Sequence, residues 1–107
     1  MNTVDDKGIT PFSGIIMSDG DYKEILNLIE IYTSYGGKIR IHEKNIYTGD
    51  TPLMLTEKAE IISFLLDKGF DINIKNNKGE TALDKAVIRN DISSIKLLLE
   101  RGANVQG

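Results

Sequence analysis

Apolar residues recur every three or four positions in three stretches of the chain, which is the spacing of one face of an α-helix. The three sets are Ile25, Leu28, Ile29 and Tyr32; Ile61, Ile62, Leu65 and Leu66; and Ile92, Ile95, Leu98 and Leu99. We therefore expect three amphipathic helices, each with one face turned toward a core. Tyr22, Tyr32 and Tyr35 also share helical spacing, and we interpret them as packing residues.

Two recurring phrases mark where helices begin and end. The first reads Gly, any residue, Thr, Pro or Ala, and a large apolar residue, and it starts at Gly8, Gly49 and Gly79. Its Gly suits a turn with positive φ, its Thr suits a helix N-cap, and its Pro suits the first helical position. The second phrase reads Phe-Leu-Leu-Asp-Lys-Gly-Phe-Asp-Ile-Asn at 64–73, returns at 97–106 and has a weaker copy at 32–40. Its glycines, Gly36, Gly69 and Gly102, suit the left-handed conformation that terminates a helix.

The spacing of these phrases predicts a repeat. Gly36 and Gly69 are 33 residues apart, as are Gly69 and Gly102. Each unit would contain a turn, a short helix that begins at the Thr, a second helix and a loop. One such helix pair cannot bury its own apolar face, so neighbouring units must stack.

The combination of Gly-x-Thr-Pro-Leu with Leu-Leu-x-x-Gly-Ala-x-Val resembles the ankyrin repeat family, over about residues 4–106. The resemblance implies an all-α fold, an ankyrin-repeat solenoid of three stacked helix-turn-helix units with projecting loops or hairpins. We expect a single domain over residues 1–107, with repeats at about 5–42, 46–75 and 76–106.

The chain departs from the family pattern at several points. Ser13, Met54 and Asp84 stand where the family has a His that braces the loops, and only the Ser and the Asp could replace part of that bracing. The second helix of the first repeat should be about one turn longer than the others. The first helix of the middle repeat should shrink to about residues 52–56, with three extra residues near 43–45 enlarging the loop before Ile46.

Composition narrows the choice of partners. The net charge is −3 and no Lys/Arg cluster stands out, so we expect neither nucleic acid nor a membrane as a partner. The absence of cysteine excludes disulfides but does not identify the redox compartment. The first residues are polar, without a secretory signal, and no apolar run approaches about 20 residues, so we expect a soluble cytoplasmic protein. Its 16 Ile residues against 3 Val indicate an A/T-rich genome. With the irregular repeats, this looks like ankyrin proteins of large DNA viruses or intracellular bacteria, which act in the host cytoplasm or nucleus.

No constellation of residues points to catalysis, a metal or a cofactor. His42 is the sole histidine and has no cysteine to share a zinc ion with, so we interpret it as an exposed loop residue. Asp19-Gly20-Asp21 lacks the further ligands of a calcium loop. We therefore expect no enzyme and no cofactor.

The resemblance implies a protein-protein interaction module that binds through a concave surface of loop tips and first helices. The family pattern places these residues there: Asp6, Lys7, Ile9, His42, Tyr47, Thr48, Asp50, Lys75, Asn77, Lys78, Glu80 and Arg89. Tyr47 is the best candidate for an energetic anchor, because aromatic residues are enriched among hot spots. Alternatively, Tyr47 folds over the enlarged loop at 43–45. A further alternative is that the chain is a spacer in a longer ankyrin array and binding lies elsewhere.

Two further expectations concern the modification of one residue and the exposure of apolar surface in the last repeat. Hydroxylases that act on ankyrin repeats prefer an Asn that follows Asp-Ile, with Leu eight residues upstream. Asn73 meets this pattern, with a plain loop-bracing role as the alternative. Apolar surface near Ile88, Ile92 and Leu99 should be exposed unless another unit follows, which predicts self-association or a missing partner.

Overall fold

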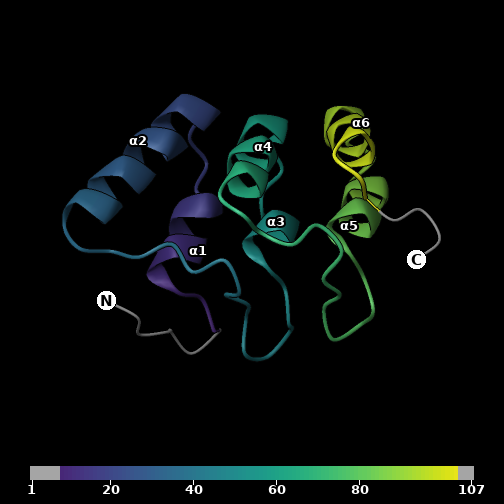
Figure 1. The fold of residues 1–107 in the computed structure, drawn as a ribbon, viewed down its shortest axis with the longest axis horizontal. Helices are drawn as coiled ribbons and strands as arrows, with labels where there is room; N and C mark the ends of the chain where they lie inside the picture. The colour runs from purple at the N-terminus through teal and green to yellow at the C-terminus, as the bar shows by residue number, and fades with distance from the viewer. Residues whose placement is uncertain (1–7, 104–107) are drawn as a thin grey trace.

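The computed structural model describes residues 8–103, and in this range the regular secondary structure consists of α-helices without strands (Figure 1). The helices are α1 (Pro11–Ile16), α2 (Tyr22–Ser34), α3 (Pro52–Leu55), α4 (Ala59–Asp67), α5 (Ala82–Arg89) and α6 (Ile92–Glu100). The prediction of an all-helical repeat fold is confirmed.

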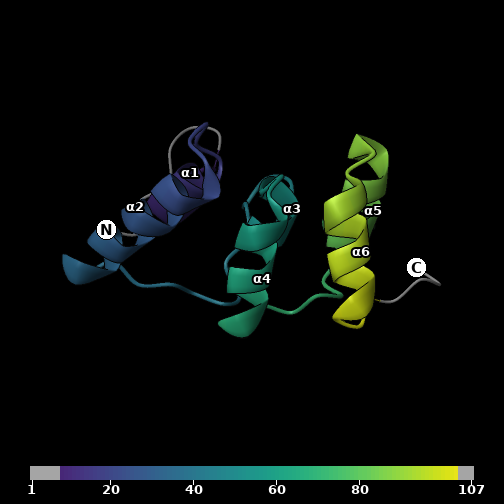
Figure 2. The ribbon, with the colours of Figure 1, turned by 90° about the horizontal axis from the view of Figure 1, so that it is seen from above.

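The helices form three pairs that stand side by side. The short helices α1, α3 and α5 make one row and the longer helices α2, α4 and α6 make a second row (Figures 1 and 2). Figure 2 shows that α2 is inclined relative to α4 and α6. The connecting loops project together beyond the short helices (Figure 1).

A continuous apolar core runs between the rows. Phe12, Ile25, Ile61, Leu65 and Leu98 come from four different helices and are fully buried. The Phe12 ring contacts the rings of Tyr32 and Phe70 at centroid distances of 6.2 and 6.3 Å. Each helix pair thus completes its core with side chains of its neighbour, as the apolar spacing predicted.

The predicted helix starts are largely confirmed. The Thr10 hydroxyl accepts the Ser13 N–H at 3.1 Å, and Thr81 forms a reciprocal capping box with Asp84. Thr51 also occupies an N-cap, but its side chain makes no capping hydrogen bond. The glycines that follow α2, α4 and α6 have φ of +96°, +103° and +96°, as expected for left-handed helix ends.

The irregular repeat lengths also appear where the sequence predicted them. Helix α2 has 13 residues against 9 in α4 and α6, and α3 has 4 residues against 8 in α5. The α2–α3 connection covers residues 35–51, three more than the α4–α5 connection at 68–81. The prediction placed all three extra residues near 43–45, and the backbone hydrogen bonds correct the position of one of them. Asn45 N–H donates to Asp50 O and Asn76 N–H donates to Glu80 O, so one of the extra residues lies inside the turn at 46–49.

Some residues of the predicted apolar faces are exposed. Leu28, Ile92 and Leu99 are 41%, 72% and 44% exposed, and Tyr35 is 81% exposed, so Tyr35 is not a packing residue. Ser94, a polar residue, is fully buried. The prediction of exposed apolar surface near Ile88, Ile92 and Leu99 is therefore confirmed for the described residues, whereas the exposure of Leu28 and Tyr35 was not predicted.

Candidate functional site

The loop tips of the second and third repeats, called the second and third tips, lie side by side along one edge of the molecule, below α3 and α5 in Figure 1. Gly49 and Gly79 lie in these tips with φ of +77° and +78°, and Gly8, at the equivalent position before α1, has φ of +79°. A Cβ atom on Gly49 would lie 2.6 Å from the Asn77 side-chain oxygen, and one on Gly8 would lie 2.9 Å from Tyr47 Cδ2. Gly8 therefore allows close packing against the second tip, and Gly49 allows close packing against the third.

Hydrogen bonds join the second tip to the third. The backbone N–H of Asn77 donates to Thr48 O at 2.9 Å, and its side-chain amide donates to Tyr47 O at 2.8 Å. Asn77 was predicted to contact a partner, but both of these groups are used between tips. The second and third tips consequently form one connected surface.

A polar cluster behind the two tips strengthens this connection. The Asn76 side-chain amide donates to the carboxylates of Asp50 at 2.8 Å and Glu80 at 2.9 Å. Lys85 Nζ lies 4.0 Å from the Asp50 carboxylate and 3.5 Å from that of Glu80. The hydrogen bond from Asn76 and the charge of Lys85 hold the pKa of the Glu80 carboxyl below its ordinary value. Two acidic side chains predicted to contact a partner are therefore engaged within the molecule.

Tyr47, Thr48 and Lys78 are the predicted site residues that the structure brings together on the outer side of the tips. All three are exposed, Tyr47 to 60%. They border a hollow of about 170 Å³ whose other lining residues are Asp50, Asn76, Asn77 and Lys85. We call the exposed side chains of Tyr47, Thr48 and Lys78 the tip surface. It combines an aromatic ring, a hydroxyl group and a cation on a connected backbone.

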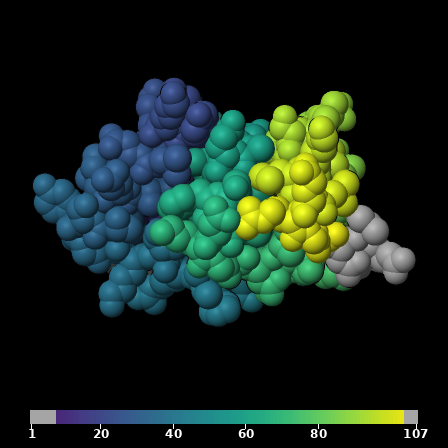
Figure 3. Space-filling model, turned by 45° about the horizontal axis from the view of Figure 1, so that its top comes forward, coloured from purple at the N-terminus to yellow at the C-terminus, as the bar shows by residue number. Residues whose placement is uncertain are grey.

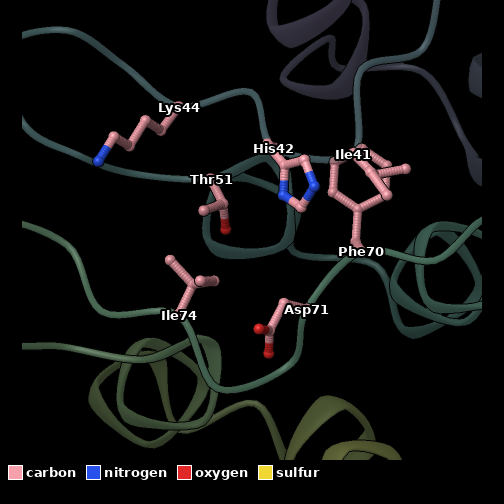
Figure 4. Close-up of a pocket in the computed structure, with 7 residues that line it drawn as sticks. All are labelled: Ile41, His42, Lys44, Thr51, Phe70, Asp71 and Ile74. Atoms are coloured by element: carbon pink, nitrogen blue, oxygen red, sulfur yellow. The ribbon is translucent and has the colours of Figure 1, made fainter.

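His42 lies in a different hollow, of about 190 Å³, between the loop that precedes the second tip and the loop after α4 (Figure 4). Its lining residues are Ile41, His42, Lys44, Thr51, Phe70, Asp71 and Ile74. His42 is exposed, as expected for a loop residue. Asn73 is exposed as well, and its backbone N–H donates to the Asp71 carboxylate at 2.9 Å. Hydroxylation of Asn73 stays a prediction.

Arg89 has an internal role that the sequence did not indicate. Its guanidinium donates to Met54 O at 3.3 Å and Thr56 O at 3.1 Å, and its Nε is buried. We expected Arg89 to face the concave side and to be free for a partner. Because α3 ends after four residues, the guanidinium instead supplies donors to carbonyl groups at the α3–α4 connection.

Glu43 is a second residue with an unexpected contact. Its carboxylate accepts hydrogen bonds from the hydroxyl groups of Thr10 and Ser13, the latter at 2.7 Å. Ser13 was expected to replace part of the missing His bracing, and it does so through this carboxylate of the enlarged loop. Sequence reasoning missed Glu43, Asn76 and Lys85. For Glu43, the available signal in the sequence was a carboxylate within the predicted insertion at 43–45.

The remaining predicted site residues add little to the tip surface. Ile9 is half-buried and Lys75 is exposed, whereas Asp6 and Lys7 lie outside the described residues. Within residues 8–103, no group of three His, Cys, Asp or Glu side chains is arranged to hold a metal ion. In the same range, no helix is both long and apolar enough to cross a membrane.

Comparisons with known proteins agree with this architecture. A family model for three copies of the ankyrin repeat matches residues 13–107. A Borreliella burgdorferi protein named for ankyrin repeats is 47% identical over 64 residues, which cover 55% of this chain and 16% of that protein. A similarly named protein of Acanthamoeba polyphaga mimivirus is 32% identical over 85 residues, 74% of this chain and 52% of that protein. The chain therefore spans about half or less of the length of these relatives.

A solved structure shows the same fold. The ankyrin repeat domain of Bcl-3 superposes with a TM-score of 0.72 at 21% sequence identity. The superposition covers 91% of this chain and 41% of that chain. At this identity the likeness concerns the fold alone.

Proposed function

Because the chain belongs to the ankyrin repeat family, whose members are generally non-enzymatic protein-protein interaction modules, we propose that it binds another protein through its tip surface. The single observation that supports this most is the exposure of Tyr47, at 60%, on a tip tied to its neighbour by backbone and side-chain hydrogen bonds. A large aromatic side chain on a held backbone loses little conformational freedom when it binds.

The neighbouring groups suit a protein partner. Asp50, Glu80 and Asn77 hold the tips together, and the exposed Thr48 hydroxyl is hydrogen-bonded to Asp50 within its own turn. The exposed charged group next to Tyr47 is therefore the Lys78 ammonium. An aromatic side chain with polar groups around it is the composition typical of an interface hot spot and its rim. The shallow hollow beside Tyr47 can receive a small side chain of the partner. The viral and bacterial relatives favour a host protein as that partner.

The proposal is tested with Tyr47→Ala and with Tyr35→Ala as a matched control. Tyr35 is also strongly exposed but follows α2, on the opposite row of helices (Figure 1). Each protein is used as bait in parallel captures from host cell extract, and the captured proteins are compared by quantitative mass spectrometry. We expect a partner that wild type and Tyr35→Ala retain and Tyr47→Ala loses, with a binding cost of about 2 kcal/mol or more.

Thermal unfolding separates binding from folding. Tyr47→Ala should unfold at the wild-type temperature, because an exposed tip side chain contributes little to the core. If both variants capture the same proteins as wild type in equal amounts, the tip surface is not the binding surface. The spacer alternative would then be favoured.

A further inference from the structure

The three longer helices can be compared position by position, because each ends at a glycine of positive φ that is 33 residues from the next. Gly36, Gly69 and Gly102 therefore provide a common origin for counting. The internal contacts between helix pairs then show which positions face the preceding pair and which face the following pair.

Positions five and one before the glycine face the preceding pair. In α4 and its C-cap these are Phe64 and Lys68, which line a groove of about 480 Å³ together with residues of α2. After α6 the position one before the glycine is Arg101, which donates to Ser63 Oγ at 3.4 Å and to Asp67 Oδ1 at 2.8 Å on α4. Each repeat thus uses these positions to reach back to its predecessor.

The same positions in the first repeat carry uncovered apolar residues. They hold Ile31 and Tyr35, which are 48% and 81% exposed. Eight residues before the glycine, Leu28 is 41% exposed, whereas its equivalents Ile61 and Ser94 are fully buried. We call the exposed side chains of Leu28, Ile31 and Tyr35 the α2 end face.

Positions ten, seven and three before the glycine face the following pair. In α2 they are Leu26, Ile29 and Thr33, and all three line the groove against Phe64. In α6 the equivalent positions hold Ile92, Ile95 and Leu99. Ile92 is 72% exposed, Leu99 is 44% exposed and Ile95 is half-buried. We call these three side chains the α6 end face. In Figure 3 the residues of α6 are drawn in yellow, at the opposite end of the molecule from the blue residues of α2.

We propose that the α6 end face of one copy of this chain binds the α2 end face of a second copy, head to tail. Most positions of the two faces are those that line the groove between α2 and α4 within the chain, so the contact continues an interface that the molecule already forms between these helices. Both faces are apolar, and burial of apolar surface is the main driving force of such packing. A face of one kind meets a face of the other kind, so the contact is heterologous, and a dimer formed in this way keeps one free face of each kind.

Side chains at the edge of this contact fit the same register. Six residues before the glycine, Ser63 of α4 contacts Arg101 of the following repeat. In the proposed contact, Lys96 of one copy occupies the position equivalent to Ser63, and Tyr35 of the other copy occupies the position equivalent to Arg101. An ammonium group placed over a Tyr ring is attractive. The register that covers the apolar residues therefore also pairs Lys96 with Tyr35.

Sedimentation velocity over a wide range of protein concentration tests the proposal, with two variants that each block one face. Ile92→Lys blocks the α6 end face, and Ile31→Lys blocks the α2 end face. Ile46→Lys is the matched control, because Ile46 is 62% exposed in the second tip and belongs to neither face. Thermal unfolding verifies that all three variants remain folded.

Wild type and Ile46→Lys should show an average mass that rises above 11.9 kDa with concentration. Ile92→Lys and Ile31→Lys should each stay monomeric alone, and an equimolar mixture of the two should form dimers through their one intact pair of faces. A monomeric wild type overturns the proposal. Self-association of either blocked variant alone, or a mixture that stays monomeric, also overturns it.

Discussion

Arg89 shows how one side chain offsets an irregularity in a different repeat. Helix α3 has only four residues, so the carbonyl groups of Met54 and Thr56 lie where a longer helix would have continued. The guanidinium of Arg89, more than 30 residues away in the chain, donates to both. Its stem is half-buried and its Nε is buried without a hydrogen-bond partner among the described residues. Arg89 is therefore a stabilising residue at the α3–α4 connection.

Replacing Arg89 with Met should lower the free energy of unfolding by about 2 kcal/mol, because hydrogen bonds from a charged group contribute about 1.5–3 kcal/mol. Met keeps most of the apolar stem, so the loss reports on the guanidinium. Arg89→Lys should restore only part of the stability, since an ammonium group lacks the planar fork that reaches two carbonyls. Urea unfolding measures all three proteins. An Arg89→Met variant as stable as wild type would show that these hydrogen bonds contribute nothing.

Glu80 makes the stability of the folded protein depend on pH. The hydrogen bond from Asn76 and the charge of Lys85 lower the pKa of its carboxyl in the folded protein below the ordinary value of 4.5. The unfolded chain therefore takes up the proton first as the pH falls. The stabilisation of the folded state by the ionised Glu80 carboxylate is complete above the pKa of the unfolded state. It is lost as the pH falls through the lower pKa of the folded state.

Glu80→Gln should accordingly melt below wild type at neutral pH, and the difference in melting temperature should shrink as the pH falls below 4.5, the ordinary pKa of the carboxyl. Glu60→Gln is the control, because Glu60 is exposed on α4. A difference between wild type and Glu80→Gln that is constant from neutral to acid pH would argue against this linkage.

At the scale of elements, the enlarged loop at 35–51 acts as a brace between the first and second repeats. Glu43 accepts hydrogen bonds from Thr10 at the start of α1 and from Ser13 within it. Thr10 is also the N-cap of that helix, so the loop holds the helix start and its capping residue together. The insertion thus supplies a bracing contact to the start of α1 in a chain that lacks the signature His.

Glu43→Ala should lower the free energy of unfolding by about 1–2 kcal/mol, because it leaves two hydroxyl groups in a partly buried site without their acceptor. Lys44→Ala, at the exposed neighbouring position, should change it by less than about 0.5 kcal/mol. Chemical denaturation of the two variants beside wild type measures both values. Equal stabilities would mean that the loop does not brace α1.

At the scale of the whole molecule, the middle pair carries the connection between the outer pairs. Helix α4 contacts both α2 and α6, and α3 contacts both α1 and α5. Stability in such a stack is the sum of small intrinsic terms and of interfaces between neighbours. Loss of packing in the middle pair therefore weakens two interfaces at once.

Leu65→Ala in α4 should lower the free energy of unfolding by about 2–5 kcal/mol, the usual cost of removing a buried Leu side chain. Leu99→Ala in α6 is the matched control and should cost less than about 1 kcal/mol, because Leu99 is 44% exposed. Far-ultraviolet circular dichroism during urea unfolding follows both variants. Similar losses would contradict the unequal burial of the two residues.

The sequence by itself determined the class of fold, the number of repeats and their unusual lengths. These follow from local signals, because positive-φ glycines, Thr N-caps and the helical period act over a few residues. Only the tertiary structure decided which polar side chains are free for a partner and which apolar residues are covered. Arg89 finds its acceptors on α3, Glu43 its donors on α1, and Asn77 its acceptors on the neighbouring tip. Such contacts join residues about 30 positions apart, where the packing of whole helix pairs, and not the local pattern, sets the distance.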